Sequence, residues 1–404
     1  MDSAEREGLR PKGNVPNLRF PEFQGEWEEH LLGNISDVTK LAGFEFTKYV
    51  TYEDNGNIIA IRGLNCKNGS LDLRDVKYID NSDFSKLSRS KLYTGDILYT
   101  YVGTVGEVAV VDKNDKYYLA PNVSRIRLSK DYNSDFIKQL LGSKKFYNQI
   151  VFPLIATSSQ PALSMENLRK FKLKVPSIRE QTKIASLLNA IDERIATQNK
   201  IIEDLKKLKS AIIEIEYTPN TKTTSHIGNV IEQISKRNKN NAIQNVLSVS
   251  NRQGFIKQSD QFENRNVASE DTSNYKIVEK NDFAFNPARI NVGSIARLTT
   301  FEKGIVSPMY ICFRTQENVA PEYIDYFFES KHFYCEIQKR LEGSVRQCLS
   351  FEGLCNIPLS LPSFEMQQRI GKRLFTLGQK IKTETDLLEL LNKQKQYLLR
   401  QMFI

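Results

Sequence analysis

The side chains with the clearest chemical potential in this sequence are arginines, asparagines and glutamines placed in loops. Arginine can make two hydrogen bonds to guanine, and asparagine or glutamine can make two to adenine, so such residues on a cationic surface are suited to reading base pairs. The candidates in the first half are Arg62, Asn65, Lys67, Tyr101, Asn122, Arg125, Ser158, Ser159 and Gln160. Those in the second half are Arg252, Gln253, Asn286, Arg289, Asn291, Arg346 and Gln347. For any one of them, a solvated loop residue is the alternative interpretation.

Patterns that would support catalysis are absent from the sequence. It has no GxxxxGK[ST] loop for ATP phosphates and no GxSxG turn around a serine. Residues 285–288 read FNPA, which lacks the second proline and the aromatic residue of the adenine methyltransferase motif. The histidines are His30, His226 and His332, and none stands among cysteines or carboxylates at metal-ligand spacing. We expect no catalysis by this chain alone, and no metal or cofactor bound to it.

Length, charge and cysteine usage limit the class of protein. A chain of 404 residues is too long for one ordinary core. No segment approaches the roughly 20 apolar residues that cross a bilayer, and the first residues lack the apolar centre of a signal peptide, so we expect a cytoplasmic protein without a membrane partner. The five cysteines show no CxxC spacing and indicate free thiols. The net charge of +9 favours a polyanionic partner, but no basic tail exists, so folding must assemble any cationic surface.

An internal repeat organises the elements that must position these loops. The sequence SKKFY at residues 143–147 returns as SKHFY at residues 330–334, a shift of 187. The same shift places Gly106 on Gly293, Pro121 on Pro308, Arg127 on Arg314 and Gln160 on Gln347. Residues 34–90 have no convincing match after Gly228. A repeated framework with divergent middles is what two modules of different specificity would show, whereas the identical Arg and Gln pairs indicate a shared task such as holding a phosphate or bracing a loop.

Each repeat combines strands and helices, which predicts a mixed α+β domain. Residues 95–103, 107–112 and 124–129 are β-branched and aromatic between Gly, Asp and Asn, as in strands. Residues 134–150 and 321–337 have helical spacing. A short helix starting near Ser164 or Ser350 then leads to a strand in 170–176 or 356–362.

Two long helices with a heptad pattern close the two repeats. Apolar residues alternate at steps of four and three in both helices, which predicts a coiled-coil seam. In the first helix the series is Ile184, Leu188, Ile191, Ile195, Gln198, Ile202, Leu205, Lys209 and Ile212. In the second it is Ile370, Leu374, Leu377, Ile381, Glu384, Leu388, Leu391, Lys395, Leu398 and Met402. We expect the helices to pair antiparallel, with the polar positions fixing the register; two separate helices on separate cores are the alternative.

The start of each long helix resembles a known family. Pro176, Glu180, Gln181, Ile184 and Leu188 match the opening of the conserved helical regions in specificity subunits of type I restriction-modification enzymes. The second copy keeps Pro362, Gln367, Ile370 and Leu374 but has Met366 in place of the glutamate, so that carboxylate should not be indispensable. The N-terminal Arg19, Phe20, Pro21, Phe23 and Trp27 are also similar to the usual entry into the first recognition domain.

The resemblance implies a domain order that covers nearly the whole chain. It gives an N-terminal tail at 1–14, target-recognition domains at 15–175 and 218–360, and conserved helical regions at 176–217 and 361–404. The coiled coil and the subunit interface would then involve Pro176, Glu180, Gln181, Ile184, Leu188, Ile191, Ile195, Pro362, Gln367, Ile370, Leu374, Leu377 and Ile381.

The resemblance also implies partners and a division of labour. Double-stranded DNA would be recognised at a bipartite, asymmetric target whose gap is set by the helices. Two methyltransferase subunits would supply S-adenosylmethionine chemistry, and two restriction and translocase subunits would use ATP and Mg²⁺. The competing hypotheses are a self-sufficient enzyme acting on DNA and a purely structural coiled-coil adaptor.

Overall fold

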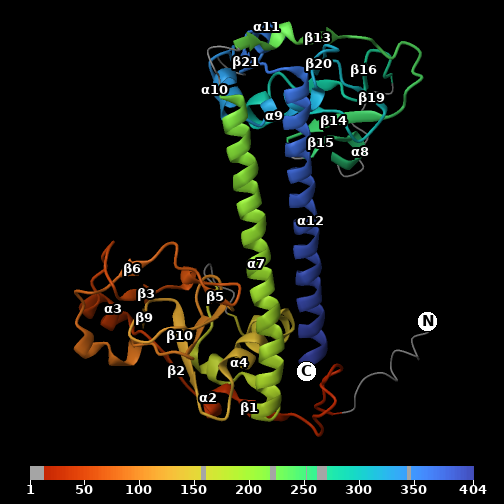
Figure 1. Ribbon diagram of the computed structural model, residues 1–404. Helices are drawn as coiled ribbons and strands as arrows, with labels where there is room; N and C mark the ends of the chain where they lie inside the picture. The colour runs from red at the N-terminus through yellow and green to blue at the C-terminus, as the bar shows by residue number, and fades with distance from the viewer. Residues whose placement is uncertain (1–12, 156–160, 219–223, 252, 262–270, 344–346) are drawn as a thin grey trace. The chain divides into compact units, whose positions relative to one another are not determined.

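The computed structural model describes residues 13–155, 161–218, 224–251, 253–261, 271–343 and 347–404 (Figure 1). The chain divides into two units, Met1–Gln198 with Leu387–Ile404 and Asn199–Asp386. Each unit contains a mixed α+β domain and one part of each long helix, so the predicted fold class and duplication are confirmed.

The same antiparallel framework sheet occurs in both units. In the first unit its order is β2 (Ser36–Lys40), β10 (Val123–Leu128), β7 (Ile97–Thr100) and β8 (Val108–Val110). In the second the order is β13 (Ile231–Ile234), β20 (Ile311–Thr315), β17 (Phe283–Phe285) and β18 (Ile295–Arg297). A two-stranded sheet accompanies each, β1 (Glu28–Leu31) with β11 (Lys172–Val175), and β12 (Thr224–His226) with β21 (Pro358–Ser360). The strands expected from 95–129 are confirmed.

The helices of the framework are shorter than the sequence suggests. Residues 134–150 contain α4 (Ser134–Leu141), α5 (Lys144–Phe146) and a π-helical turn from Tyr147 to Val151, and residues 321–337 fall in α9 (Pro321–Phe327) and α10 (Lys331–Gln338). The hydroxyls of Ser143 and Ser330 accept hydrogen bonds from Phe146 and Phe333 N–H, so each serine caps a new helix and interrupts the periodicity. The short helices predicted after Ser164 and Ser350 are α6 (Met165–Arg169) and α11 (Phe351–Cys355), each capped by that serine.

The divergent middles build a second sheet with its own core in each unit. In the first unit β3 (Ile59–Ile61) lies between β6 (Lys77–Tyr78) and β9 (Tyr117–Leu119), near α3 (Gly43–Tyr49) and the small pair β4 (Cys66–Lys67) and β5 (Ser70–Leu71). In the second unit the order is β15 (Gly254–Lys257), β14 (Val246–Ser250), β19 (Lys303–Val306) and β16 (Lys276–Glu279). The described α-helices also include the short helices α2 (Leu32–Ile35) and α8 (Gln258–Gln261).

The second sheets of the two units share a strand arrangement in which a strand of the divergent middle pairs in parallel with a strand just before Pro121 or Pro308. The strand β3 pairs in parallel with β9, and β14 pairs in parallel with β19. On its other side each first strand pairs antiparallel with a strand that follows it in the chain, β6 beside β3 and β15 beside β14, and the sheet of the second unit adds β16 beside β19. The middles are therefore variants of one plan.

Ion pairs between a partly exposed arginine and a buried aspartate brace the two framework sheets at matching places. The Arg127 guanidinium donates to both carboxylate oxygens of Asp96 at 2.7 Å, and Asp96 is buried. Arg314 makes the same two contacts to buried Asp282, at 3.1 and 3.2 Å. The shared task expected for the two arginines is therefore to hold the start of β7 or β17 against its neighbour strand.

Two glutamines attach the long helices to the framework. The Gln181 side chain accepts a hydrogen bond from Asn133 N–H at 2.9 Å and donates to the Pro176 carbonyl at 2.8 Å. The Gln367 side chain repeats both contacts with Ala320 N–H at 3.0 Å and the Pro362 carbonyl at 2.9 Å. Each buried amide therefore fixes the entry of its helix.

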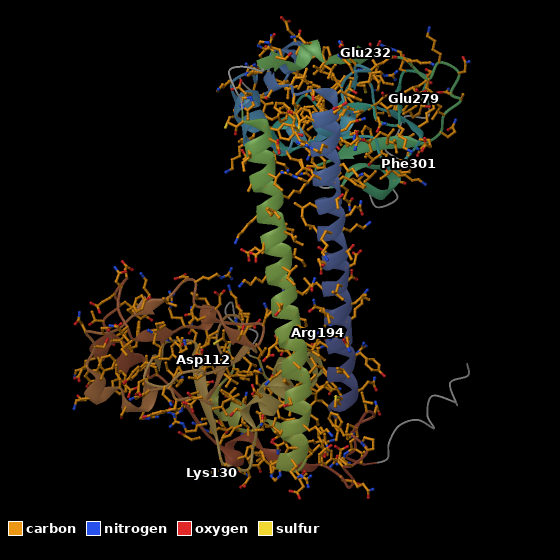
Figure 2. The ribbon with its side chains drawn as sticks, viewed as in Figure 1. Asp112, Lys130, Arg194, Glu232, Glu279 and Phe301 are labelled. Atoms are coloured by element: carbon orange, nitrogen blue, oxygen red, sulfur yellow. The ribbon has the colours of Figure 1, made fainter. Side chains whose placement is uncertain are left out.

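The long helices, α7 (Ile178–Tyr217) and α12 (Phe364–Met402), pair along the predicted seam (Figure 1). The seam residues are buried or half-buried in both helices, whereas intervening residues such as Arg194 are exposed (Figure 2). In the first unit Lys395 Nζ lies 2.5 Å from Asp192, near the start of α7 and the end of α12. In the second unit Arg373 pairs with Glu216 at 3.3 Å, near the opposite ends. The pairing is antiparallel, as predicted.

Glu180 acts in the first unit only. Its buried carboxylate receives two hydrogen bonds from Arg19, at 2.8 and 2.7 Å. Arg19 also donates to the carbonyls of Gln24 and Gly25, so this contact fixes the segment ahead of β1. Met366 takes the matching place in α12, consistent with the expectation that the repeated framework does not need the carboxylate.

Other broad expectations can be compared with the described residues. None of the described helices is both long and apolar enough to cross a membrane. Cys66, Cys312, Cys335, Cys348 and Cys355 are free thiols, as predicted.

The cysteines give a first testable prediction. Burial raises the pKa of the Cys66 and Cys312 thiols to about 12, so both stay protonated and shielded near pH 8, whereas Cys335 is exposed. Iodoacetamide at pH 8 is expected to alkylate Cys335 in the folded protein, and Cys66 and Cys312 only after unfolding, as read by peptide mass spectrometry. Equal labelling of Cys335 and Cys312 in the folded state would contradict this burial pattern.

A second prediction concerns the helix attachment. Gln181→Leu removes two hydrogen bonds and leaves the Asn133 N–H unsatisfied, which should lower the free energy of unfolding of the first unit by about 1–3 kcal/mol. Ser186→Ala, at an exposed position of the same helix, is the control. Thermal and urea unfolding of the two variants measures the difference; equal stabilities would refute the role of the amide.

Candidate nucleic-acid interface

A hairpin at one end of each framework sheet positions the candidate site. Thr100 N–H donates to the Glu107 carbonyl and Asn286 N–H donates to the Ser294 carbonyl, both at 3.0 Å, closing the β7–β8 and β17–β18 loops. The second loop is one residue longer. A later segment lies beside each loop, with Leu163 N–H bonded to the Tyr101 carbonyl at 2.8 Å in the first unit. Leu349 N–H repeats this contact with the Pro287 carbonyl at 3.0 Å.

A cavity of about 560 Å³ lies between this hairpin and the divergent middle of the first unit. Its walls come from the loop after β3, from the hairpin, and from the segment ahead of β10. The residues with polar or aromatic side chains there include Tyr52, Arg62, Lys67, Asn68, Thr104, Glu107 and Asn122. The structure thus gathers Arg62, Lys67 and Asn122, three of the predicted candidates, around one hollow.

The second unit has a cavity of about 380 Å³ at the matching place. It is bounded by the end of β14, by the β17–β18 hairpin, and by the segment ahead of β20. Its polar and aromatic residues include Ser250, Asn251, Gln258, Tyr275, Asn286, Arg289 and Tyr310. Two predicted candidates, Asn286 and Arg289, line it.

The two cavities occupy one position in the repeat but differ in chemistry. Both are bounded by the hairpin, by the residues around Pro121 or Pro308, and by the end of β3 or β14. The first contains a carboxylate, Glu107, whose place in the second unit is taken by Ser294. Among the described residues, the polar lining of the second consists of amides, hydroxyls and the guanidinium of Arg289. Two such sites would make different sets of hydrogen bonds.

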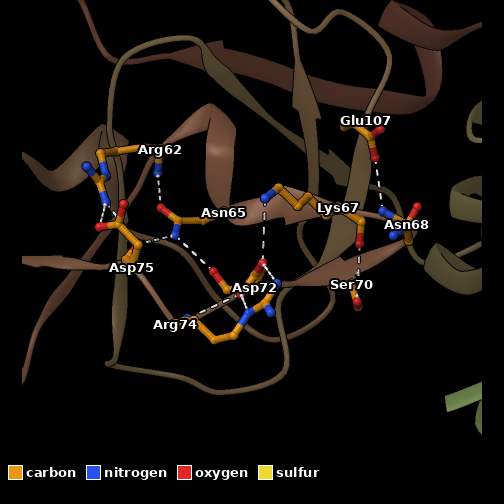
Figure 3. A network of polar contacts seen from close by, with 9 residues as sticks. All are labelled: Arg62, Asn65, Lys67, Asn68, Ser70, Asp72, Arg74, Asp75 and Glu107. Atoms are coloured by element: carbon orange, nitrogen blue, oxygen red, sulfur yellow. Dashed lines mark hydrogen bonds and ion pairs between the residues drawn. The ribbon is translucent and has the colours of Figure 1, made fainter. Parts of the chain in front are cut away.

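A polar network shapes the wall of the first cavity (Figure 3). Asn65 is fully buried, accepts from Arg62 N–H at 3.0 Å and donates to the carbonyls of Asp72 and Asp75 at 2.9 and 2.7 Å. Both amide hydrogens are therefore used inside the domain. Asn65 thus holds the loop, and its assignment to a base contact stays a prediction.

Arg62 and Lys67 keep part of their side chains accessible in this wall. Arg62 Nη2 pairs with Asp75 at 2.8 Å and is mostly covered. Lys67 is about half exposed and lies 3.7 Å from Asp72. Asn122 is exposed at a left-handed turn, with φ of 73°, a conformation that asparagine tolerates well. Lys67 and Asn122 are the accessible polar candidates of this cavity.

Tyr101 and Arg125 lie inside the first domain. Tyr101 is 9 % exposed, burial raises its pKa, and Lys40 Nζ lies 5.2 Å from its ring centre. Arg125 is 4 % exposed, pairs with Asp37 and donates to the Arg89 carbonyl at 3.0 Å. Burial also lowers the Arg125 pKa. These contacts give both residues structural roles and leave little of either side chain for DNA.

Arg289 is the most accessible candidate of the second cavity. Its side chain is exposed, and its guanidinium has no ion-pair partner within the described part of the chain. Asn286 is 8 % exposed and its amide oxygen accepts from Ala288 N–H at 3.1 Å, which shapes the hairpin. Asn291 lies in the hairpin and exposed Gln253 lies in the turn before β15; neither lines the cavity.

The remaining candidates fall at or near segments outside the described residues. Ser158, Ser159, Gln160, Arg252 and Arg346 are among the residues whose structure is not described. Gln347 is exposed and precedes Cys348, which pairs with Glu342 through two backbone hydrogen bonds of 2.8 and 2.9 Å. The assignment of these residues to DNA stays a prediction.

Several cavity residues were missed by sequence reasoning. Tyr52, Asn68 and Glu107 line the first cavity, and Asn251, Gln258, Tyr275 and Tyr310 line the second. A search restricted to the residues following Pro121 and Pro308 would have found Tyr310. Glu107 lies in the repeated hairpin, but its counterpart is Ser294, so the repeat does not single it out, and the other residues come from the divergent middles, where no repeat register is available.

The predicted interface residues of the helices also have defined places. Ile184, Leu188, Ile191, Ile195, Ile370, Leu374, Leu377 and Ile381 are seam positions, and Pro176, Gln181, Pro362 and Gln367 join helix to framework. These residues hold the chain together. Large apolar side chains exposed beside the seam are Ile201, Leu208 and Ile215 in the second unit and Leu387, Leu390 and Tyr397 in the first.

The fold and its two cavities define a tandem-repeat recognition protein, and comparison with known proteins gives the family. The model of the type I restriction modification DNA specificity domain matches twice, at residues 24–207 and 213–393, so the chain belongs to this family. The chain is 22 % identical over 427 residues to MjaX, named as a type I restriction enzyme specificity subunit of Methanocaldococcus jannaschii, covering 95 % of this chain and 93 % of the relative.

Two further proteins are similar to this chain, one over a shorter stretch of sequence and one in its structure. The EcoKI specificity subunit of Escherichia coli is 27 % identical over 123 residues, which is 29 % of this chain and 26 % of the relative. The crystal structure of the type I restriction-modification S subunit from M. genitalium is similar with a TM-score of 0.62 and 16 % identity, covering 96 % of this chain and 99 % of that one. The structural likeness supports the duplicated fold.

The Asn65 network gives a third prediction. Asn65→Ala removes three hydrogen bonds that hold residues 62–75, so amide hydrogen exchange in this segment is expected to become about tenfold faster or more. Leu73→Ala, which shortens an exposed apolar side chain of the same segment, is the control and should leave exchange unchanged. Hydrogen-exchange mass spectrometry distinguishes the variants, and unchanged protection in Asn65→Ala would contradict the bracing role.

Proposed function

We propose that this chain is the DNA specificity subunit of a type I restriction-modification complex and that it recognises a bipartite, asymmetric DNA target. Each unit would read one half of the target with the cavity between its hairpin and its divergent middle. The observation that carries this proposal is that one position in the repeat is a cavity in both units but is lined by different side chains.

The chemistry of the two cavities supports unequal half-sites. The first offers Lys67, Asn122 and the Glu107 carboxylate, which can accept from the amino group of cytosine or adenine. The second offers Arg289, which can make two bonds to guanine, with Asn251 and Gln258 beside it. Two dissimilar binding surfaces within one chain would give a target without internal symmetry.

The paired helices would set the gap between the half-sites. Antiparallel pairing along one heptad seam, with polar residues such as Gln198 and Lys209 at seam positions, favours a single register. A fixed register gives a fixed length. The number of unread base pairs should then be constant for this protein.

Partner subunits would supply the chemistry that the chain lacks. Among the described residues, no group of three or more His, Cys, Asp or Glu side chains could hold a metal. Two methyltransferase subunits would bind S-adenosylmethionine, and two restriction and translocase subunits would use ATP and Mg²⁺. The exposed Ile201, Leu208 and Ile215 follow one another at heptad spacing on α7 and offer an apolar surface to a partner helix.

Co-expression with the cognate methyltransferase subunit tests the proposal. It should create methylated adenines within one split motif that has a constant gap, as read by modification-sensitive sequencing. Methylation at a short continuous motif, or none in a complex shown to assemble, would refute it. Methylation or cleavage of DNA by the purified chain alone would instead show a self-sufficient enzyme.

A fourth prediction concerns Arg289. Arg289→Gln removes the exposed guanidinium from the second cavity and should weaken DNA binding by about 5- to 150-fold, the equivalent of about 1–3 kcal/mol. It should relax the motif at bases of one half only. Lys280→Gln, which removes a charge paired with Glu302 outside the cavity, is the matched control. Binding by fluorescence anisotropy and motif sequencing measure both effects; an unchanged affinity and motif would exclude Arg289 from the interface.

A further inference from the structure

The first unit contains another cavity, and this one is cationic. It has a volume of about 610 Å³ and lies between the start of α5 and the last turns of α12. Lys144, Lys145 and Arg400 line it together with the polar side chains of Ser143 and Asn148. No acidic residue is among the described residues of its lining.

The positive charges of this cavity are not neutralised within the described structure. Lys144, Lys145 and Arg400 form no ion pair with any described carboxylate, although lysines elsewhere in the chain commonly do. Lys145 Nζ donates to the Phe403 carbonyl at 3.3 Å. Burial, and then the charge of nearby Lys174, lower the pKa of Lys145. Such a cluster is stabilised by a bound anion.

The second unit provides an internal comparison, because an acidic side chain occupies the place that corresponds to the cationic cavity. There, the Glu214 carboxylate of α7 accepts a hydrogen bond at 3.0 Å from the backbone N–H of Lys331, the counterpart of Lys144. Glu214 holds the position in α7 that Arg400 holds in α12. The flanking residues agree with this match, since Ile213 and Leu399 are both buried in the cores of their units. One unit therefore carries its own anion where the other carries a cation.

The segment that lines the cationic cavity packs against the hairpin that lines the proposed reading site of the first unit. The Tyr147 ring packs on the turn of the β7–β8 hairpin so closely that a Cβ on Gly106 would lie 2.8 Å from it. On either side of Gly106, the hairpin residues Thr104 and Glu107 line the proposed reading cavity. Asn148, next to Tyr147, lines the cationic cavity. DNA held at the hairpin would bring its backbone towards Lys144.

We propose that this cavity binds a backbone phosphate of DNA adjacent to the half-site read by the first unit, and that the second unit has no equivalent phosphate site. The inference rests on the proposed DNA-binding function and adds an asymmetry to it. Lys144 and Arg400 supply the charge, and Ser143 and Asn148 supply further hydrogen bonds. Such a contact adds affinity without reading sequence.

Salt dependence of DNA binding tests the inference on the full chain in its complex with the methyltransferase subunit. Each lost phosphate contact reduces the slope of log K against log salt concentration by about 0.9. The variants Lys144→Gln and Arg400→Gln are therefore each expected to reduce the slope by up to this amount, with the methylated motif unchanged. Lys331→Gln, at the Lys144 counterpart beside Glu214, is the matched control and should keep the original slope.

The outcomes separate the inference from the function on which it rests. Unchanged slopes in both variants, with specific binding retained, overturn the phosphate site and leave the DNA-reading function intact. Loss of methyltransferase binding by the variants, measured by analytical ultracentrifugation without DNA, also overturns it and assigns the cavity to an acidic surface of the partner protein. If the unsubstituted complex does not bind DNA specifically, the proposed function itself fails.

Discussion

The structure depends on one constraint, which is that each long helix carries an apolar seam that must be buried. The helix α7 has 40 residues, and only its ends pack into domain cores, so most of its seam needs another helix. Because the chain is duplicated, the second helix carries the same seam and satisfies the same need. Antiparallel pairing then gives each unit the beginning of one helix and the end of the other. The duplication and the coiled coil therefore explain each other.

The two units share the contacts that hold their frameworks together, and they differ in their divergent middles. The Asp96–Arg127 and Asp282–Arg314 pairs, together with the Gln181 and Gln367 amides, make the same contacts in both units. These contacts fix the hairpins against the sheets and the sheets against the helices. The walls of the two proposed reading cavities are completed by the divergent middles, whose sequences can change without disturbing those contacts. The arrangement separates stability from specificity.

Much of the fold could be predicted from the sequence because it is repeated, but the site could be predicted only in part. Heptad spacing identifies the seam down to Lys209 and Lys395, and the position of Ser164 predicts a helix that the structure contains. Residue type alone does not tell whether an asparagine or arginine side chain faces solvent or braces the fold. From the sequence, Asn65 and Arg125 therefore suggest DNA contacts, although both are buried. The correspondence of Asp96 and Asp282 was missed in the sequence comparison. The second hairpin is one residue longer, so positions before the hairpin correspond at a shift of 186 residues, whereas positions after it correspond at a shift of 187. Cavity walls such as Tyr275 come from tertiary contacts that have no local sequence pattern.

The central claim is that the globular domain of each unit specifies one half of the target, and exchange of one domain tests it most directly. Residues 34–170 would be replaced by the same region of a relative with a different known target, and the methylated motif of the assembled complex would be determined by modification-sensitive sequencing. The account predicts that one half of the motif changes to that of the relative while the other half and the gap stay the same. A motif that does not change, or one that changes in both halves, would contradict it.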